Sequence, residues 1–496
     1  METTPSDEAP KTTAAGAATF TSPSTANAPT APATFTPLFG GAKILVAETP
    51  KAVTPFGGLC SFIAFLQQIG FGAKVAQALP FAAPTSPNAI PLAHTFTAFF
   101  FAVVTGASRF AHTDWLRGDR ALHALLGIAR FPGDDTVRAF FRRFTQGHVE
   151  AFWRPLWTWS LTLIATPPAG FHLDLDSTVI CREGQQEGAR KGYNPRRKGR
   201  NSHHPLLAVL AEAPFILHGW LRSGNCSSAR GAVEFLKEAL ALAPATLKVQ
   251  CVRADSGFFA DDFLAFLESR ALSYVVVARL TSAVKRGCVG LPDSAWTKVD
   301  ENYSVGEISL QLQGWAKSRR FIVVREQVRD DKAAVGRLLL DVPGYTYRVF
   351  VTNRSDAGAV IWRDYNGRAC VEQRIEELKN DLSAGGFCVR EFFGTEAAFL
   401  SVLFAFNLLG LYQRQLDPAR PYRQPATLRS QVFVAGAILG LAGKQVALKL
   451  SQASVGLAKH RPLLDAILRW TPPTSPKLNP CCPQRCRLAP ADRVTP

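Results

Sequence analysis

The sequence lacks several features that would assign the protein to a particular class. Its longest apolar runs, near residues 92–105 and 397–412, are shorter than the roughly 20 residues that a membrane-spanning helix needs. Its amino terminus lacks the basic start and the apolar run of a signal peptide. The ten cysteines show no regular spacing, which argues against a disulfide framework. These absences argue against a membrane protein and favour a reducing cytoplasm.

Acidic residues are scarce relative to basic ones. The chain has 39 Asp and Glu against 56 Lys and Arg, a formal net charge of +17, and 47% hydrophobic residues. It can therefore bury a core and still present an electropositive surface, which favours a polyanion such as nucleic acid as the partner. With 496 residues, the chain is too long for one compact core and should contain several units.

Composition and periodicity divide the chain into successive parts. The two parts that flank the predicted insertion combine strands and helices and indicate an α/β fold with a mixed sheet, because three successive strands precede alternating helices and strands. The predicted parts are a disordered Thr/Ala/Pro-rich arm (1–37), a helical domain whose arginines could contact DNA (38–168), a first α/β part (169–280), a separate β-rich insertion (281–345), a second α/β part (346–415), a helical region (416–470) and a Pro-rich tail (471–496).

The helical domain contains the segment TVRAFFRRFTQGHVEAFW, which has helical spacing. Asp134 and Asp135 precede it and are predicted to cap the helix. Its exposed arginines would be Arg138, Arg142 and Arg143, which could contact phosphates or simply face solvent.

Two aspartates lie in or directly after apolar, β-rich runs, where an uncompensated carboxylate is costly. Asp176 lies in FHLDLDSTVI, in which alternation places His172, Asp174 and Asp176 on one face, so periodicity does not choose between the two aspartates. Asp255 closes the strand before Ser256 and Gly257, where ligands gather in open α/β sheets. The structural alternatives are a solvated strand face for the first and a turn or helix cap for the second.

A third carboxylate lies on a predicted helix. With about 100° per residue, Tyr365, Arg368, Glu372 and Lys379 fall within roughly a 60° arc, beside the apolar stripe. Glu376 is the competing carboxylate, but it lies farther from that stripe. The structural alternative is a charged helix face with i,i+4 pairs.

A basic segment follows the first aspartate. Between Glu187 and Glu212 there is no acidic residue, and the segment could follow a DNA backbone or form a solvated turn. Its cations are Arg190, Lys191, Arg196, Arg197, Lys198 and Arg200, with Tyr193, His203 and His204 nearby.

Together these segments resemble the DDE transposases of bacterial insertion sequences, in the branch with a Y-R-E-K signature. The helix spacing Y-x2-R-x3-E-x6-K is filled by Tyr365, Arg368, Glu372 and Lys379. The segment Asp176-Ser177-Thr178, the segment beginning at Asp255 with the sequence DSGFF, and GYNPRRKGRNSHHPLL resemble further parts of the family pattern. The resemblance covers about residues 171–412.

The resemblance implies an RNase H-like core formed by residues 169–280 and 346–415, interrupted by the β-rich insertion. It also implies cut-and-paste transposition: Asp176, Asp255 and Glu372 would hold two Mg²⁺ ions, for which Mn²⁺ may substitute. Tyr365, Arg368 and Lys379 would position DNA phosphates. The implied partners are double-stranded DNA and a second copy of the chain in a homodimer, with no membrane, in the nucleoid-associated bacterial cytoplasm.

One position departs from the family pattern. Relatives that form hairpin ends often carry a Trp directly after the signature Arg, and here that position is Ala369. Trp296, Trp315 or Trp362 could stack on a base instead. Two other functions fit the sequence: an RNase H-like nuclease or resolvase without strand transfer, and a non-catalytic DNA-binding derivative of a transposase.

Overall fold

The computed structural model describes residues 31–194, 197–327, 337–339, 342–416, 421–443, 445–454 and 456–473. The chain divides into two compact units, residues 1–51 and 52–496. The first unit contains an antiparallel pair, β1 (Ala33–Phe35) and β2 (Ile44–Val46). Strand β1 lies within the arm predicted to be disordered, so that prediction is wrong for residues 33–35, whereas residues 1–30 lie outside the described residues.

The amino-terminal part of the second unit is helical, as predicted. Its elements are β3 (Ala52–Thr54), α1 (Cys60–Gln68), α2 (Phe71–Ala78), α3 (Leu92–Thr105), α4 (Arg120–Leu126), α5 (Asp134–Arg142) and α6 (Gln146–Leu161), with short 3₁₀ turns at Gly57–Leu59 and Phe110–Leu116. Phenylalanine side chains dominate the buried core between these helices.

The segment TVRAFFRRFTQGHVEAFW forms two helices instead of one. Gly133 is the N-cap of α5, and the predicted caps Asp134 and Asp135 lie in its first turn, where carboxylates favour the positive end of the helix dipole. Thr145 then starts α6, because its hydroxyl accepts a hydrogen bond from the backbone N–H of His148 in a capping box. The break follows from this local capping chemistry.

A mixed sheet of ten strands forms the centre of the second unit, which confirms the predicted α/β class with a mixed sheet. The strand order is β12-β13-β14-β16-β11-β10-β4-β8-β9, with β15 paired to β16. Strand β10 is parallel to β4 and β11, whereas the other neighbours are antiparallel. The strands are β4 (Phe171–Ser177), β8 (Leu206–Leu210), β9 (Phe215–Trp220), β10 (Val249–Ala254), β11 (Ser273–Val277), β12 (Thr297–Lys298), β13 (Tyr303–Leu310), β14 (Arg319–Gln327), β15 (Arg337–Leu339) and β16 (Val342–Thr352).

The predicted insertion is rich in strands, but it is not a separate sheet. Strand β16 pairs with β11 on one side and with β14 on the other, so the strands of residues 281–345 continue the central sheet. This register joins segments that are distant in sequence, which local periodicity does not reveal. Along the chain, the strands are separated by three helices and two 3₁₀ turns. These are α7 (Ala232–Leu242), the turn Ser256–Phe258, α8 (Asp261–Ser269), α9 (Ser282–Val289) and the turn Asp293–Ala295.

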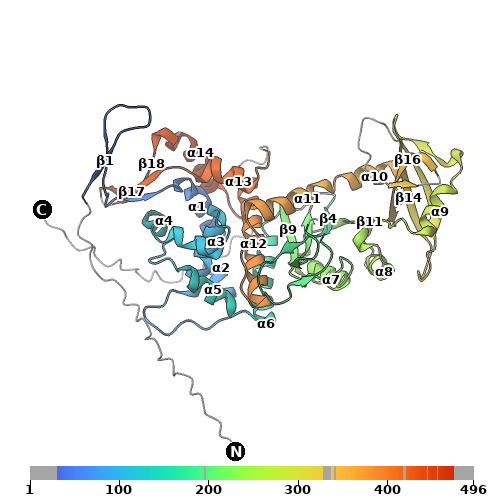
Figure 1. Ribbon diagram of the computed structural model, residues 1–496, viewed down its shortest axis with the longest axis horizontal. Helices are drawn as coiled ribbons and strands as arrows, with labels where there is room; N and C mark the ends of the chain where they lie inside the picture. The colour runs from blue at the N-terminus through green and yellow to red at the C-terminus, as the bar shows by residue number, and fades with distance from the viewer. Residues whose placement is uncertain are drawn as a thin grey trace, which may run out of the picture. The chain divides into compact units, whose positions relative to one another are not determined.

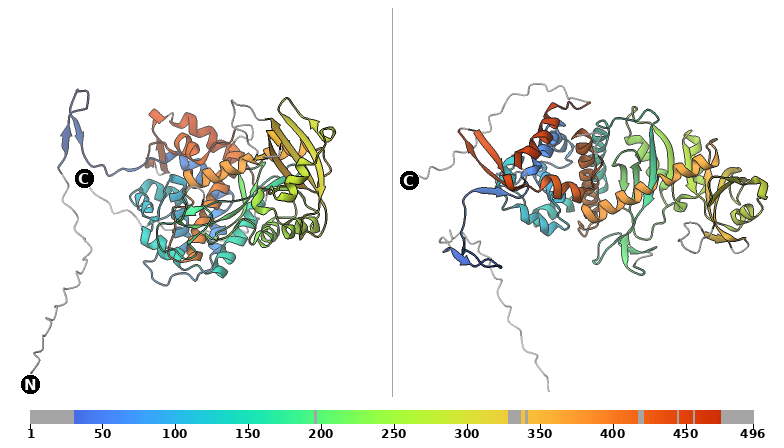
Figure 2. Two further views of the ribbon diagram at one scale, coloured as in Figure 1. Left: turned by 45° about the vertical axis from the view of Figure 1, so that its right-hand side comes forward. Right: turned by 90° about the horizontal axis from the view of Figure 1, so that it is seen from above.

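Helices α10 (Gly358–Asn366) and α11 (Ala369–Glu376) follow the sheet and lead through a π-helical turn (Glu377–Asp381) toward α12 (Phe392–Leu416). Figure 1 shows α10 and α11 as a nearly continuous ribbon that runs from the β14 and β16 part of the sheet back to α12. Helix α12 is long and apolar enough to cross a membrane, but 89% of its most apolar window is buried inside the protein. It contacts β9 on one side and α3, α5 and α6 on the other, so it is a core helix (Figure 2).

The region 416–470 contains strands where only helices were predicted. Its elements are α13 (Pro425–Leu428), a π-helical turn (Arg429–Phe433), β17 (Ala437–Ala442), β18 (Gln445–Leu450), a 3₁₀ turn (Gln452–Ser454) and α14 (Gly456–Arg469). Strand β17 lies between β18 and β3, which begins the second unit. The helical prediction is wrong for β17 and β18 because β3, the pairing partner of β17, is remote in sequence. Residues 474–496 of the predicted Pro-rich tail lie outside the described residues.

Candidate active site

Two of the predicted carboxylates follow neighbouring parallel strands. Leu175 of β4 is the register partner of Ala254 of β10, so the next positions, Asp176 and Asp255, lie side by side at the carboxyl ends of these strands. Adjacent strands are about 4.8 Å apart. Asp255 also has the capping role that its position suggested, because its Oδ1 accepts a 2.9 Å hydrogen bond from the N–H of Gly257. A cap and a site residue are compatible roles at this strand end.

Asp174 has a structural role. Its side chain is fully buried, and Arg253 on the neighbouring strand donates to it from Nε (2.7 Å) and Nη2 (2.9 Å). This bidentate pair uses both carboxylate oxygens. Of the two aspartates that periodicity left open, Asp174 is therefore tied into a buried ion pair, and Asp176 lies at the strand end beside Asp255.

Asp176 lies among other charged groups. The pKa of Asp176 is raised to about 6: burial raises it most, the carboxylates of Asp255 and Glu372 also raise it, and Arg368 lowers it. The guanidinium of Arg368 lies 3.2 Å from Asp176 Oδ2 and donates to the carbonyl of Leu175 at 2.9 Å. Arg368 is 6% exposed, so its guanidinium is buried against the aspartate.

The four signature residues do not share one regular helix. Tyr365 lies in the last turn of α10, where it is buried and packs against the ring of Phe350, and Arg368 lies at the break before α11. Glu372 is exposed on α11, as is the competing Glu376. Lys379 lies in the π-helical turn, close enough to His204 to lower its pKa. The break and the wider turn alter the helical phase on which the predicted arc depended.

The three predicted carboxylates are electrostatically coupled, but they are not assembled into a chelating group. In the described ranges, no three His, Cys, Asp or Glu side chains lie close enough together to hold a metal ion. The donor set nevertheless suits a hard cation, since it consists only of carboxylate oxygens and crowds like charge around Asp176. The assignment of a metal site to Asp176, Asp255 and Glu372 stays a prediction.

The sequence of the chain was compared with known protein families, and one family matches most of it. Residues 36–471, most of the chain, match the family Transposase DDE domain group 1. The chain belongs to this transposase family. The match covers the strand ends of Asp176 and Asp255 and the helix of Glu372, and it supports a role in transposition. A comparison with curated proteins finds no match.

Among the solved structures that are similar to this transposase is one described as "Cryo-EM structure of piggyBac transposase synaptic complex with hairpin DNA". The similarity covers 78% of this chain and 82% of that chain, with 12% identity and a TM-score of 0.38. At this level the similarity carries no argument about the site.

A hydroxyl and imidazole cluster lies beside the two aspartates of the transposase, and the sequence did not single it out as part of the site. Burial lowers the pKa of His204. Because a carbonyl can only accept, Nδ1 of His204 donates to the Cys226 carbonyl (2.7 Å), so Nε2 accepts from Ser177 Oγ (3.1 Å). Ser177 Oγ is also 2.8 Å from Ser228 Oγ. In the sequence, the signal for this cluster was the pair Ser177-Thr178, which directly follows Asp176.

A network of ion pairs joins α10 to the start of β4. His172 lies 3.1 Å from Asp364 and 2.5 Å from Glu212, and these hydrogen bonds raise its pKa to about 9. Arg354 also pairs with Asp364, whose pKa falls to about 2 despite burial, mainly through His172. Arg253 donates to the backbone carbonyl of Asp364 at 2.5 Å. The network fixes the helix that leads to Arg368 and Glu372.

The His172 contacts predict a pH dependence of stability. Because folding raises the pKa of His172 from 6.5 to about 9, its stabilisation is complete below pH 6.5 and is lost as the pH rises toward 9. Urea unfolding from pH 6 to 9.5 should therefore show a falling free energy of unfolding, and His172→Gln should reduce that fall. His94→Gln is the control, because burial lowers the pKa of His94, so its contribution to stability rises with pH near 6.5, then levels off, and does not fall toward pH 9. An equal fall in His172→Gln and wild type would contradict the prediction.

The basic segment of the transposase lies on a small sheet of β5 (Ile180–Cys181), β7 (Asn201–His203) and β6 (Arg190–Lys191). Arg197, Lys198 and Arg200 are exposed, and Glu183 lies 2.9 Å from Arg200 and 3.8 Å from Arg197, which offsets part of their charge. Arg196 lies outside the described residues.

The aromatic side chains near this segment differ in exposure. His203 and His204 are buried, so they do not share the exposed surface of the basic segment. Tyr193 is 75% exposed and stays available for such a contact. Of the tryptophans considered for base stacking, Trp296 packs under Arg325, and Trp362 packs on Tyr303.

Proposed function

We propose that this protein is a transposase of the insertion-sequence branch with the Y-R-E-K signature, that it cleaves DNA at the ends of a mobile element, and that it joins those ends to target DNA. In this proposal the central sheet is an RNase H-like core and transposition follows a cut-and-paste route. The observation that carries the proposal is the placement of Asp176 and Asp255 at the ends of adjacent parallel strands, with Glu372 near enough to raise the pKa of Asp176.

Asp176, Asp255 and Glu372 would hold two Mg²⁺ ions, and Mn²⁺ should substitute because it also accepts oxygen ligands. When bound, the ions would supply a nucleophile at neutral pH and stabilise the charge on the leaving oxygen. Glu372 would have to move closer to the aspartates, since the described residues contain no assembled ligand group. Its exposed position on α11 leaves it free of the buried core.

Arg368 would have two successive roles. It neutralises Asp176 in the structure, and a cation at that carboxylate would release its guanidinium to grip a DNA phosphate in bidentate fashion. Lys379 would add a point charge on the same side, next to His204. Tyr365 is buried against Phe350, so its part would be to support the helix that carries Arg368.

The exposed basic segment would bind the phosphate backbone of double-stranded DNA. Each neutralised phosphate releases counterions, so affinity should fall steeply with salt. The variant Arg196→Ala/Arg197→Ala/Lys198→Ala should bind an element end more weakly, with a flatter slope of log affinity against log salt. Fluorescence anisotropy between 50 and 200 mM salt (about the range in which such losses are large) measures this slope. Lys74→Ala/Lys298→Ala changes exposed or half-exposed lysines elsewhere and is the control. A slope unchanged from wild type would remove the segment from the interface.

Two element ends must be brought together for transposition, so we propose a homodimer in the DNA complex. The proposed location is the nucleoid-associated cytoplasm of a bacterium, where both the element and its target lie.

The direct test uses purified protein, a labelled fragment of an element end, and Mg²⁺. The proposal predicts metal-dependent cleavage that leaves a 3′ hydroxyl, and joining of a pre-cut end to target DNA. Cleavage without joining would favour the nuclease or resolvase alternative. Binding without metal-dependent nicking would favour the non-catalytic derivative.

A further inference from the structure

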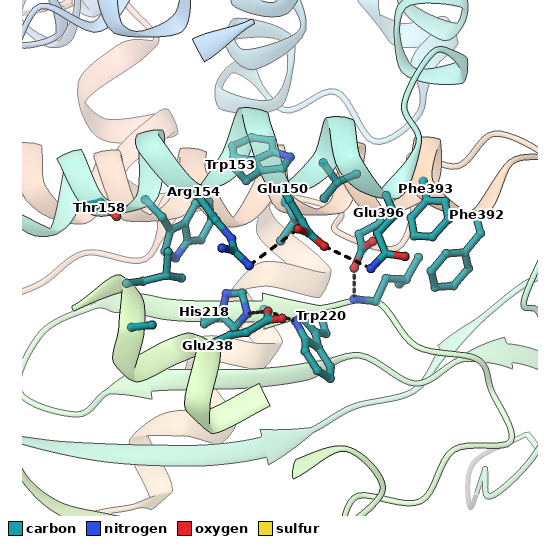
Figure 3. A pocket seen from close by; sticks show the side chains of 18 residues that line it. Glu150, Trp153, Arg154, Thr158, His218, Trp220, Glu238, Phe392, Phe393 and Glu396 are labelled. Carbon is teal, nitrogen blue, oxygen red and sulfur yellow. Dashed lines mark hydrogen bonds and ion pairs between the residues drawn. The ribbon is translucent and has the colours of Figure 1, made fainter. Parts of the chain in front are cut away.

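A cavity of about 420 Å³ lies between α6, β9, α7 and the first turns of α12 (Figure 3). This volume falls in the range of roughly 300–1,000 Å³ that is usual for small-molecule sites. Strand β9 is the edge of the central sheet, two strands away from β4, so the cavity is separate from the site at Asp176. Large aromatic side chains line it: Trp153, Trp157, Trp220, Phe392 and Phe393.

Acidic side chains contribute most of the charge in the cavity. Glu396 is 8% exposed, and its Oε1 accepts a 3.1 Å hydrogen bond from the N–H of Leu221. Figure 3 shows Glu396 and Glu150 facing the same space. Across the cavity, Glu238 accepts hydrogen bonds from His218 (3.2 Å) and Trp220 (2.9 Å). A negative cavity in a chain of net charge +17 selects for a cationic group.

The charge of Glu396 is poorly compensated. The pKa of Glu396 is raised to about 7, mainly by burial and in part by the carboxylates of Glu238 and Glu150, whereas the hydrogen bond from Leu221 lowers it. The charged or titratable groups that line the cavity around it are Glu150 and Arg154 on α6, His218 on β9 and Glu238 on α7. Arg154 lies 3.7 Å from Glu150, and burial lowers the pKa of His218, so neither provides a dedicated partner for Glu396.

The shape of the cavity favours an organic cation over a metal ion. No three of its ligand-type side chains lie close enough together to chelate a metal, within the part of the chain that the structure describes. A guanidinium group is planar, carries several donors in one plane and stacks on aromatic rings, which matches separated carboxylates between aromatic walls.

We propose that this cavity binds an alkylguanidinium group, with the head group between Glu396 and Glu150 and its face against the aromatic walls. The group can belong to a free small molecule or to an arginine side chain of the protein itself. Arg485 and Arg487 in the Pro-rich tail are the intramolecular or intersubunit source to test.

The first test titrates argininamide into the full-length protein and follows tryptophan fluorescence and heat. Citrullinamide has nearly the same shape without the charge and is the matched control ligand. The proposal predicts saturable binding of argininamide and at least tenfold weaker binding of citrullinamide. Equal binding of the two ligands would overturn it.

The variant Arg485→Ala/Arg487→Ala distinguishes the two sources. If the tail occupies the cavity, argininamide binds more tightly to this variant, and if the ligand is external, both proteins bind it equally. Argininamide that binds to neither protein would overturn the proposal.

A further pair of variants tests the carboxylate. Glu396→Gln keeps an acceptor for the N–H of Leu221 and removes the charge, so it should weaken argininamide binding about tenfold or more, whereas Glu307→Gln, in β13, should change nothing. Wild-type affinity should also rise from pH 6 to pH 8 as Glu396 loses its proton. Glu396→Gln with wild-type affinity and the same pH profile would refute the proposed site.

Discussion

Replacing Asp176, Asp255 or Glu372 with alanine should lower the rate of DNA cleavage by about 10³-fold or more, because in the proposed mechanism each variant would remove a ligand of a catalytic centre that acts as a unit. Binding of an element end should stay within a few-fold of wild type, since DNA affinity depends on exposed cations elsewhere. Cleavage is measured on a labelled end fragment in Mg²⁺, and binding is measured by anisotropy without metal.

Stability and a neighbouring carboxylate provide the controls for this prediction. Asp176→Ala leaves the buried guanidinium of Arg368 without its carboxylate partner, so this variant should be less stable than wild type, and its cleavage is measured under conditions in which urea denaturation shows it to be folded. Glu376→Ala removes an exposed carboxylate from the same helix and should keep most of the activity. If Glu376→Ala is inactive while Glu372→Ala still cleaves, the third site residue has been assigned to the wrong glutamate.

The second large effect concerns stability. Asp174→Ala should lower the free energy of unfolding by about 3–5 kcal/mol, because it leaves the buried guanidinium of Arg253 without its bidentate partner. Arg253→Ala should cost a similar amount, and both effects are measured by urea denaturation at constant pH.

Replacing both Asp174 and Arg253 shows how much of the loss in the free energy of unfolding comes from an unpaired buried charge and how much comes from lost packing. Asp174→Leu/Arg253→Met should recover most of the loss, since well-packed apolar side chains often replace a buried ion pair without cost. A single variant with wild-type stability would show that Asp174 is not held by this pair. It would then reopen the choice between Asp174 and Asp176 as the site residue.

Local patterns predicted the elements of the α/β part well. Alternation indicated β4, and runs separated by polar or Gly/Pro-containing turns indicated β8 and β9. The strand that ends before Asp255 was recognised from its apolar residues and the following Ser-Gly turn. These signals depend on neighbours in sequence, which is why they were readable. The pairing of β16 with β11 and of β17 with β3 depends on remote segments, so the insertion and the carboxy-terminal region were misjudged.

The arrangement of the candidate site could be predicted only in part from the sequence. The positions of Asp176 and Asp255 follow from strand ends. Helical phase placed Arg368 in one arc with Glu372, and the family resemblance implied that it positions DNA phosphates, whereas in the structure it is buried and pairs with Asp176. Likewise, the sequence does not reveal that Arg253 occupies both oxygens of Asp174, because this pair forms across strands. The contribution of His204 and Ser228 depends on a hydrogen-bonded contact with Ser177 that spans distant residues.

The most direct test of the central claim is a crystal structure of the protein with Mn²⁺ and an element end, analysed for anomalous scattering. The account predicts two manganese peaks about 3.5–4 Å apart between Asp176, Asp255 and Glu372, with Arg368 moved away from Asp176. Manganese bound elsewhere, with the contact between Arg368 and Asp176 intact and the DNA end in place, would contradict it.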